Sequence, residues 1–123
     1  MDIEKLKIPE KIDTPYVCLD PEKGQCDIIG KSYPEDVSLF YNQVEDWFDD
    51  YIYFGEKDLL MNMKLSYFNS STQKVFTQIF EKLKRAKFAI TVNWHYPAED
   101  DEILENGKIY MTFTGFKFNF LPY

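Results

Sequence analysis

The stretch LLMNMKLSYFNSSTQKVFTQIFEKL at residues 59–83 decides the fold. Residues 59–68 place alternate apolar side chains, ending with Tyr67, on one face, and Leu60 and Phe68 on the other. This pattern predicts a strand largely covered on both sides. Residues 69–72, Asn-Ser-Ser-Thr, are typical of a helix start. Apolar residues then recur at spacings of three and four, which predicts an amphipathic helix: Val75, Phe76, Ile79, Phe80 and Leu83.

The same alternation of strand and helix patterns continues on both sides of this stretch. Runs at 16–19 and 26–29 flank turn residues and predict a β-hairpin. A helix follows, with Asp36 as its N-cap and Gly55 at its end. After residue 83 the sequence predicts a strand at 88–94, a helix that starts at 97–102 and is weakened by Gly107, and a strand at 116–120.

The predicted order is β-β-α-β-α-β-α-β, which indicates an α/β fold with a mixed, mainly parallel sheet and about three helices. A chain of 123 residues, 45% of them hydrophobic, suffices for one compact domain. We expect that domain at residues 14–123, after a loose lead-in at residues 1–13.

Charge and composition exclude several classes of function. The net charge of −7 argues against binding to nucleic acid or to an anionic membrane surface. The sequence has neither an apolar run long enough to span a bilayer nor a secretory signal at its start, so we expect a cytoplasmic protein.

The cysteines and the single histidine suggest no metal site, and we expect no cofactor. In the predicted hairpin Asp20 lies opposite Gln25, so Cys18 faces Asp27 and Cys26 faces Leu19. The two thiols then point to opposite faces of the ribbon, which argues against a disulfide.

The most informative candidate site is Asn69, Ser70, Ser71 and Thr72, where a strand ends and a helix begins. Ligands and functional groups collect at such strand ends, and a helix start tolerates a phosphate. A phosphate there would add nearly two negative charges to the surface. Plain N-capping explains the same residue types, and from the residue types alone it is the favoured interpretation.

Four other features of the sequence are candidate sites. His95 near Asp100 and Asp101 is a conceivable general base, but the sequence juxtaposes no nucleophile with it. The consecutive acids at 99–102 are better explained as a helix start than as a cation site. The basic residues Lys82, Lys84, Arg85 and Lys87 indicate a solvated helix end rather than a nucleic-acid site. Tyr33, Pro34 and Glu35 form a strand-to-helix corner that can belong to a binding edge.

Several segments together resemble the SiaC family of bacterial regulatory phosphoproteins, from about Thr14 to the C-terminus. The segments are Tyr33–Asp36, 43–47, 65–74, 94–96, 99–102 and Gly107. His95 stands where the family motif usually has an aromatic residue. This family resembles STAS domains, the fold of anti-anti-sigma factors.

The resemblance implies a switch with three protein partners: a kinase, a metal-dependent serine/threonine phosphatase, and an effector such as a diguanylate cyclase. The unphosphorylated form would activate the effector, in cyclic di-GMP and biofilm signalling. The phosphoacceptor follows the motif asparagine and is therefore Ser70, with Ser71 as the alternative. The partner-binding residues expected on this basis are Tyr33, Pro34, Glu35, Asn69, Ser70, Ser71, Thr72 and Lys74.

Two rival hypotheses remain open. The chain can be a constitutive protein-binding module of the same fold that is never phosphorylated, since its hydroxyl residues suit capping alone. It can also be an enzyme that uses His95 and a neighbouring acid, a hypothesis that rests only on the single histidine beside an acidic cluster.

Overall fold

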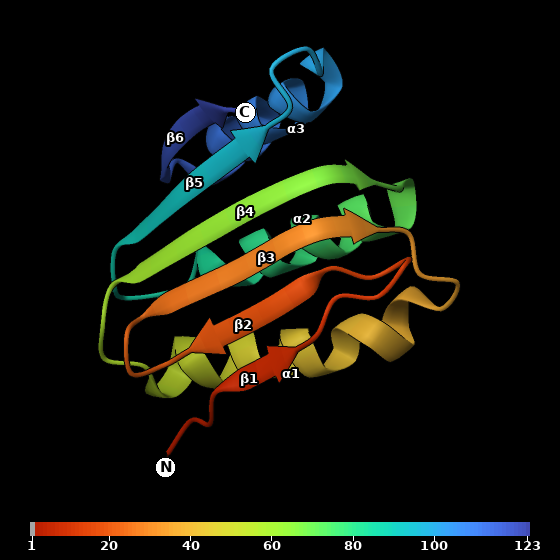
Figure 1. The fold of residues 1–123 in the computed structure, drawn as a ribbon. Coiled ribbons are helices and arrows are strands. Elements are labelled where there is room, and N and C mark those ends of the chain that lie inside the picture. The colour runs from red at the N-terminus through yellow and green to blue at the C-terminus, as the bar shows by residue number, and fades with distance from the viewer. Residues whose placement is uncertain (1) are drawn as a thin grey trace.

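Six strands form one sheet in the computed structural model, which describes residues 2–123 (Figure 1). The strands are β1 Leu6–Ile8, β2 Tyr16–Asp20, β3 Gln25–Ser32, β4 Leu59–Phe68, β5 Ile90–Tyr96 and β6 Lys117–Pro122. The helices are α1 Val37–Phe54, α2 Ser70–Leu83 and α3 Asp101–Thr114. Among residues 2–123 no helix is long and apolar enough to cross a membrane.

The sheet order is β1-β2-β3-β4-β5-β6, so every strand lies beside the one that precedes it in the chain. The β1–β2 and β2–β3 pairs are antiparallel and the other three pairs are parallel. The mixed, mainly parallel sheet is therefore confirmed. The hairpin register is confirmed as well, with Cys18 opposite Asp27 and Cys26 opposite Leu19, and both thiols are free.

Strand β1 corrects the expected loose lead-in at residues 1–13. Leu6, Lys7 and Ile8 pair with β2, so the observed order is β-β-β-α-β-α-β-α-β. The Trp47 indole of α1 also donates a hydrogen bond of 2.8 Å to the Glu4 carbonyl. Three residues between Lys5 and Pro9 give almost no strand pattern, and this strand forms because β2 offers it an edge.

All three helices lie on one face of the sheet, behind it in Figure 1. The apolar side of β4, from Leu59 to Leu65, is buried against them, whereas Leu60 and Lys64 on its other side are only half-buried. The prediction that this strand is largely covered on both sides is therefore wrong. Intervening apolar residues such as Leu60 are tolerated on a partly exposed face.

The uncovered face carries a row of polar side chains across four strands, which we term the amide ladder: Asp27, Asn62, Asn93 and Asn119. Asn62 Nδ2 donates to Asp27 Oδ1 at 2.8 Å and Asn93 Nδ2 donates to Asn62 Oδ1 at 2.9 Å. Asn119 Nδ2 continues the row to Asn93 Oδ1 at 3.0 Å. Because Asn62 and Asn93 each donate one hydrogen bond and accept another, the ladder satisfies polar groups that no helix covers.

Helix α3 runs without a break through Gly107, the residue that weakened its prediction. A Cβ at this position would lie 2.5 Å from Trp94 Nε1. The same indole nitrogen donates to the Ile103 carbonyl at 2.9 Å. The glycine therefore lets α3 approach Trp94 of β5 closely, which offsets its poor helix propensity.

Candidate functional site

The predicted helix start is confirmed in detail. Asn69 is the N-cap of α2, and its Oδ1 accepts a hydrogen bond of 2.9 Å from the Thr72 backbone N–H. Ser70 and Ser71 occupy the first two helical positions and both are exposed. Both hydroxyls therefore lie within reach of a modifying enzyme, at the carboxyl end of β4 and at the positive end of the helix dipole.

Thr72 is completely buried, which corrects its assignment as a partner-binding residue. Its Oγ1 lies 2.8 Å from Ser32 Oγ and 3.2 Å from the Ser32 carbonyl oxygen. Ser32 Oγ in turn lies 2.6 Å from Tyr41 Oη. The third residue of the helix thus points inward, and we term Ser32, Tyr41 and Thr72 the hydroxyl network. It joins β3, α1 and α2 beneath the exposed serines.

Burial governs the chemistry of the tyrosines that support the site. It raises the pKa of Tyr41 well above its usual range, so the phenol stays protonated and can donate within the hydroxyl network. Burial also raises the pKa of Tyr110 to about 12. Tyr110 Oη of α3 donates to the Gln73 carbonyl at 3.0 Å, so the first turn of α2 is held from a second side.

The register of the β3–β4 pair shifts just before the candidate site, and this shift reverses the faces of the Tyr67 and Phe68 side chains. Gly30 of β3 pairs with Leu65, but Lys31 pairs with Tyr67, so Ser66 has no counterpart. Tyr67 is 51% exposed, whereas Phe68 packs 5.3 Å, centroid to centroid, from Phe76 in the core. The predicted faces of Tyr67 and Phe68 are therefore wrong, because a one-residue irregularity reverses side-chain alternation.

The corner of residues 33–35 lies beside the serines, because the Asn69 N–H donates to the Ser32 carbonyl at 3.0 Å. Tyr33 is 39% exposed and meets Tyr67 edge to face with ring centroids 6.0 Å apart. Glu35 and Lys74 are exposed as well. Pro34 is buried, which corrects its assignment to the binding surface, since a buried ring offers a partner little contact area.

An open hollow of about 400 Å³ adjoins this corner at the start of α1. It reaches from Thr14 and Glu35 to Phe40, with Leu39, 77% exposed, at its rim. Leu39 and Tyr67 were not predicted as site residues. Leu39 falls beside the apolar stripe of α1 in the sequence and could have been recognised as an unpartnered large side chain.

His95 lies on the uncovered face of β5, paired with Lys64 of β4. Burial lowers its pKa and the charge of Lys64 lowers it further. The charge that acts on this imidazole is thus that of a lysine rather than of the nearby acids. Asp100 instead caps α3 and accepts from the Ile103 N–H at 3.0 Å, which confirms the acids as a helix start.

Two of the basic residues near the end of α2, Lys82 and Lys84, contact other side chains of this chain. Lys82 pairs with Asp49 of α1 at 3.1 Å. Lys84 lies 4.6 Å above the ring of Phe113. These contacts fit the predicted helix end at the surface.

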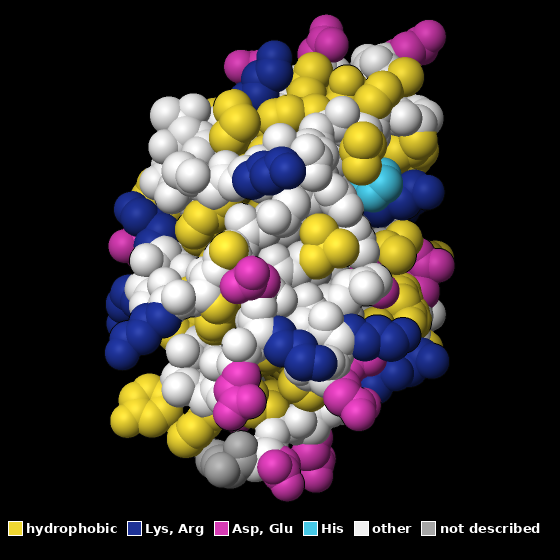
Figure 2. Space-filling view, turned by 90° about the vertical axis from the view of Figure 1, so that its left-hand side faces the viewer, with side chains coloured by type: hydrophobic (Ala, Val, Ile, Leu, Met, Phe, Trp, Pro, Cys, Tyr) yellow, Lys and Arg dark blue, Asp and Glu magenta, His cyan; other side chains and the backbone are white. Residues whose placement is uncertain are grey.

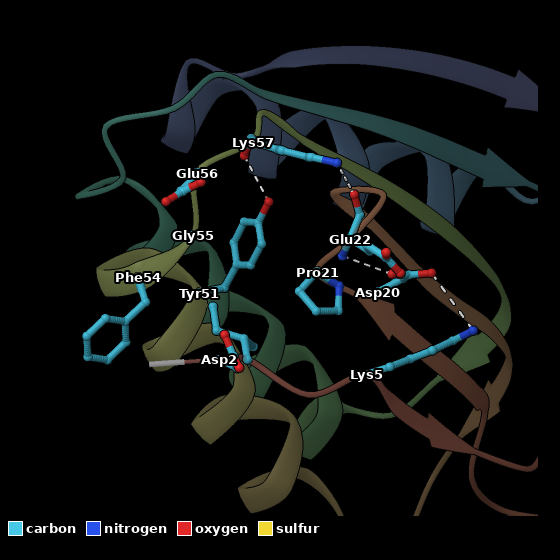
Figure 3. A pocket seen from close by; sticks show the side chains of 11 residues that line it. Asp2, Lys5, Asp20, Pro21, Glu22, Tyr51, Phe54, Gly55, Glu56 and Lys57 are labelled. Atoms are coloured by element: carbon cyan, nitrogen blue, oxygen red, sulfur yellow. Dashed lines mark hydrogen bonds and ion pairs between the residues drawn. The ribbon is translucent and has the colours of Figure 1, made fainter.

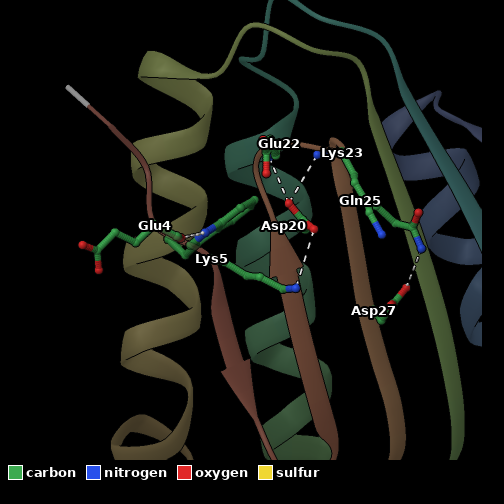
Figure 4. Close-up of polar contacts among 8 residues, drawn as sticks. Glu4, Lys5, Asp20, Glu22, Lys23, Gln25 and Asp27 are labelled. Carbon is green, nitrogen blue, oxygen red and sulfur yellow. Dashed lines mark hydrogen bonds and ion pairs between the residues drawn. The ribbon is translucent and has the colours of Figure 1, made fainter.

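A hollow of about 590 Å³ is drawn in Figure 3, and its lining residues Asp20, Pro21 and Lys57 place it at the end of the sheet opposite Ser70. Its polar groups mostly serve the fold. Asp20 accepts from the Glu22 N–H at 3.0 Å and pairs with Lys5 at 3.8 Å (Figure 4). Tyr51 Oη donates to the Lys57 carbonyl at 2.9 Å. The turns at this end of the sheet are held by these hydrogen bonds and this ion pair, and the hollow is lined by none of the predicted site residues.

Comparison with known proteins gives consistent results. A family model described as SiaC family regulatory phosphoprotein matches residues 8–123. An uncharacterized protein of Pseudomonas aeruginosa, strain UCBPP-PA14, is 29% identical over 103 residues, which cover 81% of this chain and 82% of that protein.

Two solved structures from the same species match nearly the whole fold. Apo-SiaC from Pseudomonas aeruginosa is 26% identical with a TM-score of 0.87, over 96% of this chain and 98% of that one. The second structure is described as the diguanylate cyclase SiaD in complex with its activator SiaC. It is 26% identical with a TM-score of 0.89, over 96% of this chain and 99% of that one.

Proposed function

Because this chain belongs to the SiaC family of regulatory phosphoproteins, we propose that it is a non-catalytic switch whose state is set by phosphorylation of Ser70. A partner kinase transfers the γ-phosphoryl group of ATP to Ser70 Oγ, with loss of the hydroxyl proton and release of ADP. A metal-dependent serine/threonine phosphatase returns the hydroxyl by hydrolysis. The use of ATP fits a cytoplasmic protein.

The observation that carries this proposal is the difference in exposure among three neighbouring hydroxyls, those of Ser70, Ser71 and Thr72. The Thr72 hydroxyl is buried and hydrogen-bonded within the hydroxyl network, while Ser70 and Ser71 are exposed. Capping of α2 needs only Asn69 and leaves the serine hydroxyls unused. Ser70 directly follows the capping asparagine, and a phosphate there would gain from the free N–H groups of the first helical turn.

Phosphorylation would act through charge and shape at the surface around Ser70. The unmodified serine is small and lets a partner approach Tyr33, Tyr67 and the hollow beside α1. A phosphate would add nearly two negative charges near Glu35 and obstruct close packing. A loss of about 3 kcal/mol would weaken a complex more than 100-fold, which suffices to empty a micromolar one.

The effector we propose is a diguanylate cyclase, activated by the unphosphorylated form. Support comes from the relative that is described as the activator of the cyclase SiaD, since this chain shares its fold over nearly its full length. Through such an effector the switch would control cyclic di-GMP production and biofilm formation.

Intact-mass measurement after incubation with the cognate kinase and ATP tests the acceptor. The kinase can be sought among genes adjacent to the one encoding this chain. Wild type and Ser71→Ala should each gain one phosphoryl group, and Ser70→Ala should gain none. The reverse pattern would make Ser71 the acceptor, and uptake by both variants would remove the proposed site.

The constitutive module is the second candidate, supported by the complete capping role of Asn69. Capture of the cyclase by immobilised protein separates the two. The proposed switch requires that Ser70→Asp captures much less cyclase than wild type, and that phosphorylated protein no longer raises the rate of cyclic di-GMP synthesis. Equal capture and equal activation would favour the module.

A further inference from the structure

The two edges of the sheet are protected to very different degrees. An edge strand exposes unpaired N–H and C=O groups, and proteins usually guard it with short length, charge or proline. Edge strand β1 has three residues and is flanked by Lys5 and Pro9. Edge strand β6 has six residues and carries Lys117 and Pro122 only at its ends. Its middle, residues 118–121, is without charge.

Exposed apolar side chains lie at the same end of the molecule as β6. Leu121 of β6 and Phe113 of α3 are each 37% exposed, and Ile109 of α3 is 57% exposed. Ile109 and Phe113 line a shallow hollow of about 380 Å³ on α3. Figure 2 shows hydrophobic side chains gathered at the upper end of the molecule, the end at which Figure 1 places β6 and α3.

The middle of β6 reads the same in both directions around Asn119: Phe118, Asn119, Phe120. In an antiparallel pair of identical strands centred on this asparagine, each Phe118 faces a Phe120 and Asn119 faces its own copy. Aromatic pairs directly opposite each other stabilise such strands. Lys117 faces Leu121, so no like charges oppose each other, and the lysine stem can cover the leucine.

The amide ladder ends at this same asparagine. Asn119 uses one Nδ2 hydrogen to reach Asn93, and its carboxamide still has a second hydrogen and the Oδ1 acceptor. A second Asn119 placed opposite would use both groups in a reciprocal amide pair. The ladder would then cross the edge and continue through the second molecule.

From these observations we propose that β6 is an interface for a second copy of this chain, with the two strands antiparallel and paired about Asn119. The contact is isologous, so it closes as a two-fold dimer with one continuous twelve-stranded sheet. The two α3 helices then run antiparallel beside the joined edges and cover Ile109 and Phe113. The carboxyl ends of the parallel strands, and with them the two Ser70 sites, face opposite directions.

Analytical ultracentrifugation of the full chain over a range of concentrations up to about 1 mM tests the interface. Wild type should approach the dimer mass. Asn119→Asp should weaken dimerisation at least 10-fold, because two carboxylates then face each other on the two-fold axis. The matched control is Asn93→Asp on β5, one strand away from the edge. It loses the hydrogen bond that Asn93 donates in the amide ladder and adds one negative charge. It should dimerise within about 3-fold of wild type.

Hydrogen exchange locates the contact independently of any variant. Backbone amides of 117–122 should exchange more slowly at high than at low concentration, while those of β1 should not change. If the wild type is monomeric at all concentrations, the proposal is wrong. That result would also overturn it if a strand of another protein pairs with β6 instead. Equal weakening by both Asp variants, or protection confined to other elements, would overturn it too.

Discussion

The Ser32 hydroxyl lies 2.8 Å from the Thr72 hydroxyl, so a buried contact ties the end of β3 to the first turn of α2. These residues are 40 positions apart in the chain. The contact lies beneath Ser70 and fixes the direction in which α2 leaves the sheet. The exposed serines therefore lie on a helix turn that buried hydrogen bonds hold to the sheet, which suits the site proposed above.

Thr72→Ala should lower the free energy of unfolding by about 1–3 kcal/mol, because it takes a hydrogen-bond partner from both the hydroxyl and the carbonyl of buried Ser32. Urea unfolding at neutral pH measures this loss. Ser71→Ala, one residue away but exposed, is the control and should stay within about 0.5 kcal/mol of wild type. Similar losses for both variants would contradict the structural role of the network.

Gly107→Ala should destabilise the protein by about 1–3 kcal/mol, although alanine is the better helix former. The added Cβ would lie 2.5 Å from the Trp94 indole nitrogen and would force α3 away from β5. Thermal unfolding should show a midpoint lower by several degrees. Lys108→Ala, the exposed neighbour, should leave the midpoint unchanged or raise it, and an equal midpoint for both would refute the close-packing argument.

Much of the fold could be predicted from local pattern. The Asp36 cap, the helix start at residues 69–72 and the hairpin register follow from residue type and spacing, and all are confirmed. Strand β1 could not be predicted, because three residues carry too little periodicity and gain their structure from β2. Local rules succeed where neighbours in sequence determine the geometry.

At the site, the errors arise from contacts distant in sequence. Thr72 is typical of an exposed first turn, but the packing of α2 on β3 turns it inward to Ser32. The faces of Tyr67 and Phe68 depend on the register shift opposite Gly30, whose φ of +128° suits glycine. Nothing in residues 59–68 alone signals that shift. The accessible serines, by contrast, could be found from the capping pattern.

Ser70→Asp should raise the free energy of unfolding by about 0.3–1 kcal/mol while weakening effector binding, because a negative charge at the start of α2 interacts favourably with the helix dipole. Urea unfolding at low ionic strength measures the gain. Thr77→Asp places the same charge at an exposed position in mid-helix and should bring no gain. Destabilisation by Ser70→Asp would mean that lost binding reflects lost structure rather than surface charge.

The single histidine allows a direct pH test. Burial and the charge of Lys64 lower the pKa of His95 below the usual value of about 6.5, so the unfolded chain binds this proton more readily than the folded one. The free energy of unfolding should therefore fall on acidification from about pH 6.5 toward pH 5, before the carboxylates dominate. The fall should be smaller in His95→Asn.

NMR titration of the imidazole checks the cause of this pH dependence. Lys64→Gln should raise the pKa of His95 toward 6.5, because one of the two effects is removed. Lys117→Gln removes a charge from β6 and is the control. An unchanged imidazole titration in Lys64→Gln would show that burial alone perturbs the histidine.

The strand order has a consequence for biosynthesis. Each strand pairs with the one made just before it, so the sheet can be extended in the direction of translation without waiting for a distant partner. The Ser70 end of β4 is supported by β3, α1 and α3, all of which precede β6 in the chain, and β6 joins last. A nascent chain can thus bury its apolar segments as they leave the ribosome, which limits the time they are free to aggregate.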